Sequence, residues 1–298
     1  MFDGTRPTEN KEHVGLNFGA IAQVFRGPFL KRIADGTHIT PLLEIRRCCA
    51  LDHLCESDSL RNWLDCLYRL MCRNYRCEYL FKNALANKIF LSRHNIHRSY
   101  FTSEIRAGKS RADTVILNGT SSVYEIKSDL DSFERVSKQL ADYGKVFDKI
   151  FVVTSPKNAE QAFNLVPSHV GVIAMLDDST LSPLKEPLSN KKNVEPSTIF
   201  DCLRQPEYCK IIRSQFGDIP DVPNSRIYRE CKDLFCNLSP KVAHDNMVTA
   251  VRTRGKKKTF EILIDSAPYS LKHACISFSG SQKQASQITE KLHQPLMT

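Results

Sequence analysis

The middle of the chain carries short apolar runs rich in β-branched residues, which are typical of buried strands. These runs lie at 100–105, 112–117, 123–127, 149–154 and 170–176. Between the third and fourth runs, apolar residues recur at intervals of three and four from Phe133 to Phe147, which predicts an amphipathic helix. A hairpin followed by strand, helix and strand predicts an α/β fold with a mixed central sheet flanked by helices.

Helical spacing predominates on both sides of this segment. Residues 41–92 read as helical, and so do residues 198–215 and 225–254, whereas residues 1–40 look loosely structured. The Ser, Gly and Gln-rich C-terminal segment predicts weak order. We expect a helical and loop extension over 1–75, a core over 76–178, a C-terminal helical region packed on the core over 179–260, and a partly disordered tail over 261–298.

The composition is that of a globular protein with a basic charge balance. Of the 298 residues, 41% are hydrophobic and 25% are charged, and 42 Lys and Arg against 33 Asp and Glu leave a net charge of +9. A basic balance favours a polyanionic partner such as nucleic acid. The N-terminus has no apolar signal segment, and no run approaches the roughly 20 apolar residues that span a bilayer. We therefore expect a cytoplasmic protein without membrane association.

The 11 cysteines raise the question of a zinc site. Cys48, Cys49, His53 and Cys55 lie close together in the sequence, but no Cys-x-x-Cys pair occurs. Helical apolar spacing around Cys66 indicates a buried helix face instead. Free thiols packed as small hydrophobic side chains are therefore favoured, with a zinc-stabilised regulatory protein as the alternative.

The candidate chemistry lies in the predicted hairpin. Glu125 and Lys127 are two apart on a strand and therefore point to the same face. Asn118-Gly119 is a strong turn signal, and a three-residue loop over 118–120 would place Asp113 directly opposite Glu125. A loop one residue longer or shorter would turn Asp113 to the other face of the sheet.

Two neighbouring carboxylates repel each other unless a cation lies between them. Mg²⁺ prefers such oxygen ligands, so Asp113 and Glu125 are candidate metal ligands, with the Ile126 carbonyl as a third. Lys127 could then stabilise an attacking hydroxide or the charge growing on a scissile phosphate. The alternative is a surface hairpin with an incidental salt bridge.

A basic and aromatic segment precedes the hairpin. Arg106, Lys109 and Arg111 could contact phosphates, and Tyr100 and Phe101 could stack on unpaired bases. A solvated loop with two core aromatic residues explains the same segment equally well.

The residues around the hairpin resemble the PD-(D/E)XK nuclease superfamily, most closely a group of little-characterised bacterial proteins within it. The similarity covers about residues 76–215. It is carried by Arg111, Asp113, Tyr124 to Asp129, Gln139, Tyr143, Phe147, Asp148, Val152 to Thr154 and the Leu203 to Glu207 segment. Ala112 departs from the pattern, because a proline often precedes the acid.

The resemblance implies a restriction-endonuclease-like fold and Mg²⁺-dependent hydrolysis of phosphodiester bonds, with Mn²⁺ able to substitute. Asp113, Glu125 and Lys127 fall on the catalytic positions, and Gln139 falls where a helix residue faces the catalytic lysine. A further metal-binding acid would be Glu78 or Glu104. For Tyr143, core packing is favoured over a functional role.

We therefore expect a nuclease that acts on DNA rather than RNA. The alternative is a catalytically weak or inactive protein of the same fold that binds nucleic acid or a protein partner. The residues leave the oligomeric state open, with a homodimer among the alternatives.

Overall fold

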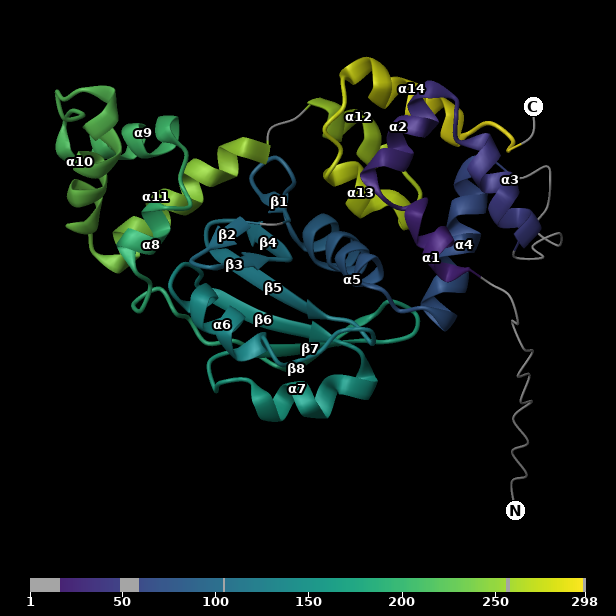
Figure 1. Ribbon diagram of the computed structural model, residues 1–298, viewed down its shortest axis with the longest axis horizontal. Coiled ribbons are helices and arrows are strands. Elements are labelled where there is room, and N and C mark those ends of the chain that lie inside the picture. Colours follow the sequence, from purple (N-terminus) through teal and green to yellow (C-terminus); the bar gives the residue numbers. More distant parts are fainter. Residues whose placement is uncertain (1–16, 49–58, 104, 256–257, 297–298) are drawn as a thin grey trace.

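The computed structural model describes residues 17–48, 59–103, 105–255 and 258–296. Its centre is a six-stranded sheet in the order β1-β4-β5-β6-β7-β8, beside a separate two-stranded hairpin of β2 and β3 (Figure 1). The strands are β1 (Tyr100–Thr102), β2 (Ile105–Ala107), β3 (Ser110–Ala112), β4 (Thr114–Leu117), β5 (Ser121–Lys127), β6 (Lys149–Thr154), β7 (Gly171–Met175) and β8 (Leu181–Lys185).

The sheet is mixed, as predicted. β1, β4 and β5 form an antiparallel meander, β5, β6 and β7 are parallel, and β8 returns antiparallel to β7. The parallel strands are joined by α6 (Val136–Gly144), and by η2 (Pro156–Asn158) followed by α7 (Ala159–Leu165). β8 was not predicted, because Pro183 interrupts its short apolar pattern.

The register of the β4–β5 hairpin confirms the predicted loop. Leu117 lies opposite Ser121 and Thr114 lies opposite Tyr124, which leaves residues 118–120 as the loop. Gly119 has a φ of 103°, a conformation that only glycine adopts readily. Continued by one residue, the same register sets Asp113 opposite Glu125.

Each face of the sheet has its own core. One core joins alternate residues of β4 and β5, among them Ile116 and Ile126, to α5 (Glu78–Leu85), which continues as the π-helical turn η1 (Ala86–Leu91). The other joins Val115 and Val123 to α6. Because successive strand residues point to opposite faces of the sheet, alternate residues of β4 and β5 pack on the α5 side and on the α6 side.

Further helices extend these two cores in opposite directions (Figure 1). The helices from both ends of the chain join the core on the α5 side. The core on the α5 side includes α1 (Phe18–Gln23), α2 (Gly27–Asp35), α3 (Ile39–Cys48), α4 (Leu60–Asn74), α12 (Lys258–Ser266), η4 (Tyr269–Leu271), α13 (Lys272–Ile276) and α14 (Gln282–Leu292). The core on the α6 side includes α8 (Pro196–Phe200), α9 (Gln205–Phe216), α10 (Asn224–Cys236) and α11 (Pro240–Arg252), which ends in η3 (Thr253–Gly255). None of the helices in these described ranges is long and apolar enough to cross a bilayer.

Helical extensions are present on both sides of the core, as predicted, and parts of their described residues are more ordered than expected. Helices α1 and α2 occupy part of the segment that we expected to be loosely structured. In the tail, α14 begins with a capping box between Ser281 and Gln284 and buries Ala285, Ile288 and Leu292. The prediction of weak order for this part of the tail was therefore wrong.

Candidate functional site

Glu125 and Lys127 project from β5 toward α6 and are almost fully buried. Their exposed fractions are 1% and 6%, and Lys127 Nζ lies 2.9 Å from Glu125 Oε1. A buried charge is costly unless it is paired. The two side chains neutralise each other inside the protein, so they are not a solvated surface pair.

Helix α6 supplies two polar partners to this ion pair. Lys127 Nζ donates to Gln139 Oε1 at 3.1 Å, and the Tyr143 hydroxyl donates to Glu125 Oε2 at 2.6 Å. Gln139 and Tyr143 are four apart and therefore share one face of the helix. The resemblance placed Gln139 near the lysine, and the structure brings these side chains together.

The hydroxyl contact of Tyr143 is the feature that the sequence did not predict. Its ring is buried and packs edge-on against Phe147, as expected for core packing, but its hydroxyl also reaches the Arg111 carbonyl at 2.7 Å. Burial and the Glu125 carboxylate raise the pKa of Tyr143 far above its usual value, so it remains a donor. The four-residue spacing from Gln139 was the available signal.

Asp113 lies immediately before β4 and reaches the same end of β5. Its Oδ2 accepts the Ile126 N–H at 2.8 Å. Burial, and then the nearby Glu125 carboxylate, raise the pKa of Asp113 to about 7. The two acids are thus close enough for their charges to oppose each other, as the predicted register requires.

These groups offer hard oxygen donors from two acids and one backbone carbonyl. The N–H and C=O of a strand residue point to the same side, so the Ile126 carbonyl is directed toward the Asp113 side of β5. This donor set fits Mg²⁺. Both oxygens of Glu125 already have partners, Lys127 and Tyr143, so a metal ion there would share or displace the lysine.

Of the two proposed additional acids, only Glu78 lies in the described residues, and it is engaged elsewhere. Glu78 pairs with Lys82 at 2.6 Å and its side chain is 50% exposed. Its charge raises the pKa of Asp113, although less than Glu125 does. Glu104 lies outside the described residues. Across the described part of the chain, no three His, Cys, Asp or Glu side chains are arranged to hold a metal ion.

The cysteines in the described ranges carry free thiols. Cys49, His53 and Cys55, which motivated the zinc alternative, lie outside the described residues, as does the side chain of Cys48.

The basic residues before Asp113 lie on the β2–β3 hairpin. Arg106 pairs with Arg111 across it, and both side chains are exposed, as is that of Lys109. Asp142 of α6 holds the turn by accepting the Lys109 N–H at 3.3 Å and the Ser110 hydroxyl at 2.7 Å. Helix α6 therefore positions this hairpin as well as the ion pair.

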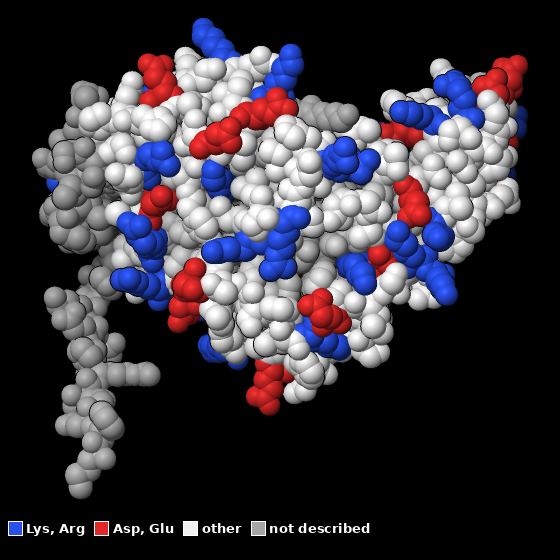
Figure 2. Space-filling model, turned by 180° about the vertical axis from the view of Figure 1, so that it is seen from behind, with Lys and Arg blue, Asp and Glu red and all other residues white. Residues whose placement is uncertain are grey.

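On the face opposite to that seen in Figure 1, the positive charges do not form a single patch. Figure 2 shows Lys and Arg side chains interspersed with Asp and Glu side chains across that face. The basic balance of the chain is therefore weak support for an anionic partner by itself, and specific groups of cations carry more weight.

A second series of hydrogen-bonded polar side chains connects α11 to the sheet. Ser121 Oγ lies 2.7 Å from His244 Nε2, and His244 Nδ1 lies 3.0 Å from Asp245 Oδ1. The order of groups is that of a serine hydrolase triad. However, Ser121 and His244 are both 0% exposed, and Ser121 Oγ also accepts the Asp148 N–H at 3.0 Å, so this arrangement connects structural elements.

The fold and the charged cluster define a mixed α/β protein with a buried acid–lysine pair beside a second acid. The chain belongs to the Bacteriophage P4 protein cII family, which matches residues 71–272. Protein cII of Enterobacteria phage P4 is 26% identical over 152 residues, which are 48% of this chain and 54% of that protein. The chain thus spans about half the length of this curated relative.

Among solved structures, the SPO1766 protein of unknown function from Silicibacter pomeroyi is similar over 49% of this chain and 92% of its own. The identity is 16% and the TM-score is 0.31, too low to support a statement about fold or function.

Proposed function

We propose that this protein is a metal-dependent nuclease of the PD-(D/E)XK superfamily that hydrolyses phosphodiester bonds, most readily in DNA. The observation that carries the proposal is the convergence of Asp113, Glu125 and Lys127 at one end of β5. Two acids and an ammonium on adjacent strands are what metal-assisted phosphodiester cleavage requires.

In this proposal Asp113, Glu125 and the Ile126 carbonyl would hold Mg²⁺, with Mn²⁺ as a substitute. A bound divalent ion polarises the phosphate and makes its water a better nucleophile. Glu104, outside the described residues, stays a candidate for a further ligand, and so does Glu78 if its side chain leaves Lys82.

Lys127 has the donors that the reaction needs. An ammonium group has three N–H donors, of which Glu125 and Gln139 accept two. The third is available for a phosphate oxygen or the attacking hydroxide, whose charge it would stabilise. Gln139 would orient Lys127, and Tyr143 would orient Glu125.

Arg106, Lys109 and Arg111 would contact the phosphate backbone from the hairpin that leads into Asp113. A cytoplasmic location is part of the same proposal, because free thiols suit a reducing compartment.

The second candidate is a nuclease-fold protein without catalysis that binds nucleic acid or a protein partner. One observation favours it: both Glu125 oxygens are engaged by Lys127 and Tyr143. An acid whose hydrogen bonds are satisfied needs no metal ion to remain buried.

Cleavage assays separate the two candidates. Purified protein is incubated with supercoiled plasmid and with single-stranded DNA in Mg²⁺, Mn²⁺ or EDTA. The nuclease proposal expects cleavage only with the metal ions, and a loss of at least about 100-fold in Lys127→Ala. Lys149→Ala, on neighbouring β6, is the matched control and should cleave normally.

Circular dichroism and thermal melting establish that each variant is folded at the assay temperature. Metal-independent cleavage, or equal cleavage by the wild type and a folded Lys127→Ala variant, would refute the nuclease proposal. DNA binding without cleavage under any metal ion would support the second candidate.

A further inference from the structure

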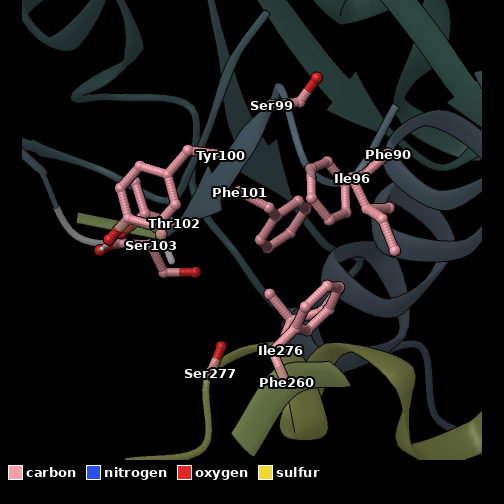
Figure 3. A pocket seen from close by; sticks show the side chains of 11 residues that line it. Phe90, Ile96, Ser99, Tyr100, Phe101, Thr102, Ser103, Phe260, Ile276 and Ser277 are labelled. Atoms are coloured by element: carbon pink, nitrogen blue, oxygen red, sulfur yellow. Dashed lines mark hydrogen bonds between the residues drawn. The ribbon is translucent and has the colours of Figure 1, made fainter. Parts of the chain in front are cut away.

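A groove runs along β1, on the outer edge of the sheet. Two adjoining cavities of about 190 and 640 Å³ form it and share Ile96, Ser99, Gly255 and Phe260 in their walls. Residues from the η1–β1 segment form one wall, and η3 and α12 form the other. The smaller cavity is drawn in Figure 3.

The smaller cavity is lined by aromatic rings. Phe90 and Phe101 lie 5.4 Å apart between centroids, and Phe90 and Phe260 lie 6.4 Å apart. Figure 3 shows Phe101 between Tyr100 on one side and Phe90 with Ile96 on the other, with Phe260 and Ile276 below. Phe90 and Phe101 are buried, whereas Tyr100 and Phe260 are partly exposed and can present a ring to a planar ligand.

Hydroxyl groups stand beside these rings. Thr102, Ser103 and Ser277 line the same cavity (Figure 3), and the Ser277 side chain belongs to an exposed residue. A cavity with ring faces and a few hydroxyl groups suits a nucleobase, which stacks through its faces and hydrogen-bonds through its edges.

The larger cavity is basic. Its described lining residues include Arg98, Arg252, Lys258 and His97, against the single carboxylate of Glu261. Arg98 and Lys258 are exposed and Arg252 is partly exposed. Cations that line a groove next to aromatic rings match a chain in which phosphates alternate with bases.

One end of the groove lies at the end of the sheet that holds Asp113. Thr102, at the C-terminal end of β1, lies opposite Val115 of β4. Val115 is two residues from Asp113, a distance of about 7 Å along a strand. The end of the groove that holds Thr102 and Ser103 is therefore the end nearest Asp113. The aromatic cavity lies on the α5 side of the sheet, whereas Glu125 and Lys127 project toward α6, so a bound strand would pass around this edge of the sheet to reach them.

We propose that this groove binds an unpaired DNA strand, with a base in the aromatic cavity and phosphates along the basic one. The inference rests on the proposed nuclease function and specifies single-stranded DNA as its substrate class. Binding of a peptide as an additional strand along the outer edge of β1 is disfavoured. The helical turn η3 packs beside that strand, and the groove is basic.

The test is fluorescence anisotropy with a labelled oligo-dT strand and a labelled duplex of equal length, in EDTA, so that binding is measured without cleavage. We expect the single strand to bind at least tenfold more tightly than the duplex. Phe260→Ala should weaken single-strand binding about tenfold, the effect of one lost base stack. Phe163→Ala, an exposed aromatic residue of α7, is the matched control and should bind normally.

Two further variants make the test independent of one substitution. Arg252→Gln should reduce the slope of log affinity against log salt by about 0.7, whereas Lys210→Gln, on α9, should leave it unchanged. Gly255→Ala should close the cavity without removing a ring, because its Cβ would overlap the Tyr100 ring.

The inference is overturned if duplex and single strand bind equally, or if folded Phe260→Ala and Gly255→Ala bind oligo-dT like the wild type. Lys127→Ala should lose cleavage, which the binding assay in EDTA does not measure. Failure of this inference is therefore distinguishable from failure of the nuclease proposal, which depends on cleavage alone.

Discussion

Replacing Lys127 by Met tests whether the ion pair is as buried as the structure places it. Lys127 is 6% exposed and its partner Glu125 is 1% exposed, with 2.9 Å between the charged atoms. The substitution keeps an unbranched side chain only one atom shorter but leaves a buried carboxylate whose described partner is the Tyr143 hydroxyl. Removing one member of a buried pair costs about 3–5 kcal/mol.

The free energy of unfolding is measured by urea titration followed by circular dichroism, in EDTA. Lys127→Met should lose about 3–5 kcal/mol relative to the wild type. The double variant Glu125→Gln with Lys127→Met should recover at least about 1 kcal/mol of this loss, because the unpaired charge at Glu125 is then removed as well. Neither variant should cleave DNA.

Mg²⁺ adds a second comparison within the same experiment. A ligand that binds only the folded state stabilises it by about 2.7 kcal/mol at 100 times its dissociation constant. Lys127→Met frees Glu125 Oε1, so Mg²⁺ should stabilise this variant more than the double variant. If Lys127→Met costs less than about 1 kcal/mol in EDTA, the pair is solvated and the reasoning from burial is refuted.

Three further predictions follow from other parts of the structure. Burial, with a smaller effect of Lys82, lowers the pKa of His273 to about 3 from an ordinary 6.5. The stability that neutral His273 contributes is therefore complete above pH 6.5 and is lost as pH falls toward 3, by about 1.4 kcal/mol per pH unit. A His273→Gln variant whose urea midpoint falls as steeply as that of the wild type between pH 7 and 5 would contradict this. Asp142→Ala removes the acceptor that fixes the β2–β3 turn, so trypsin should cut this basic hairpin faster than in the wild type. Equal cutting rates would count against a role of Asp142 in holding the turn. Gly119→Val should lower the free energy of unfolding by about 1–2 kcal/mol, because β-branched residues are strained at its φ of 103°; an unchanged urea midpoint would show that the loop relaxes.

The hairpin could be predicted because its determinants are local. Two β-branched runs separated by Asn118-Gly119 leave few choices of loop, and the loop sets the register that brings Asp113 to Glu125. The position of Gln139 could be anticipated only from the resemblance. The Tyr143 hydroxyl contact could not, because apolar periodicity indicates where a ring is buried but not what its polar tip meets.

Helical extensions at both ends were predicted, but the individual helices α1, α2 and α14 were not, because their order depends on distant partners. Helix α14 packs against α2, and Lys291 Nζ donates to the Ala34 carbonyl at 2.8 Å. The Leu60 N–H donates to the Gln294 carbonyl at 2.9 Å. Short amphipathic segments such as these gain most of their stability from tertiary packing, which local sequence does not contain.

The pairing of α2 with α14 has a consequence for biosynthesis. Phe29, Leu30 and Ile33 of α2 are buried in a core completed by residues beyond position 280. At about 5–20 residues per second, a ribosome needs roughly 13 to 50 seconds to make the intervening chain. During that time the apolar stripe of α2 lacks this cover, so nascent chains released early should recruit chaperones. A stop codon before Gln282 should lower the yield of folded protein, although it removes none of the proposed catalytic residues.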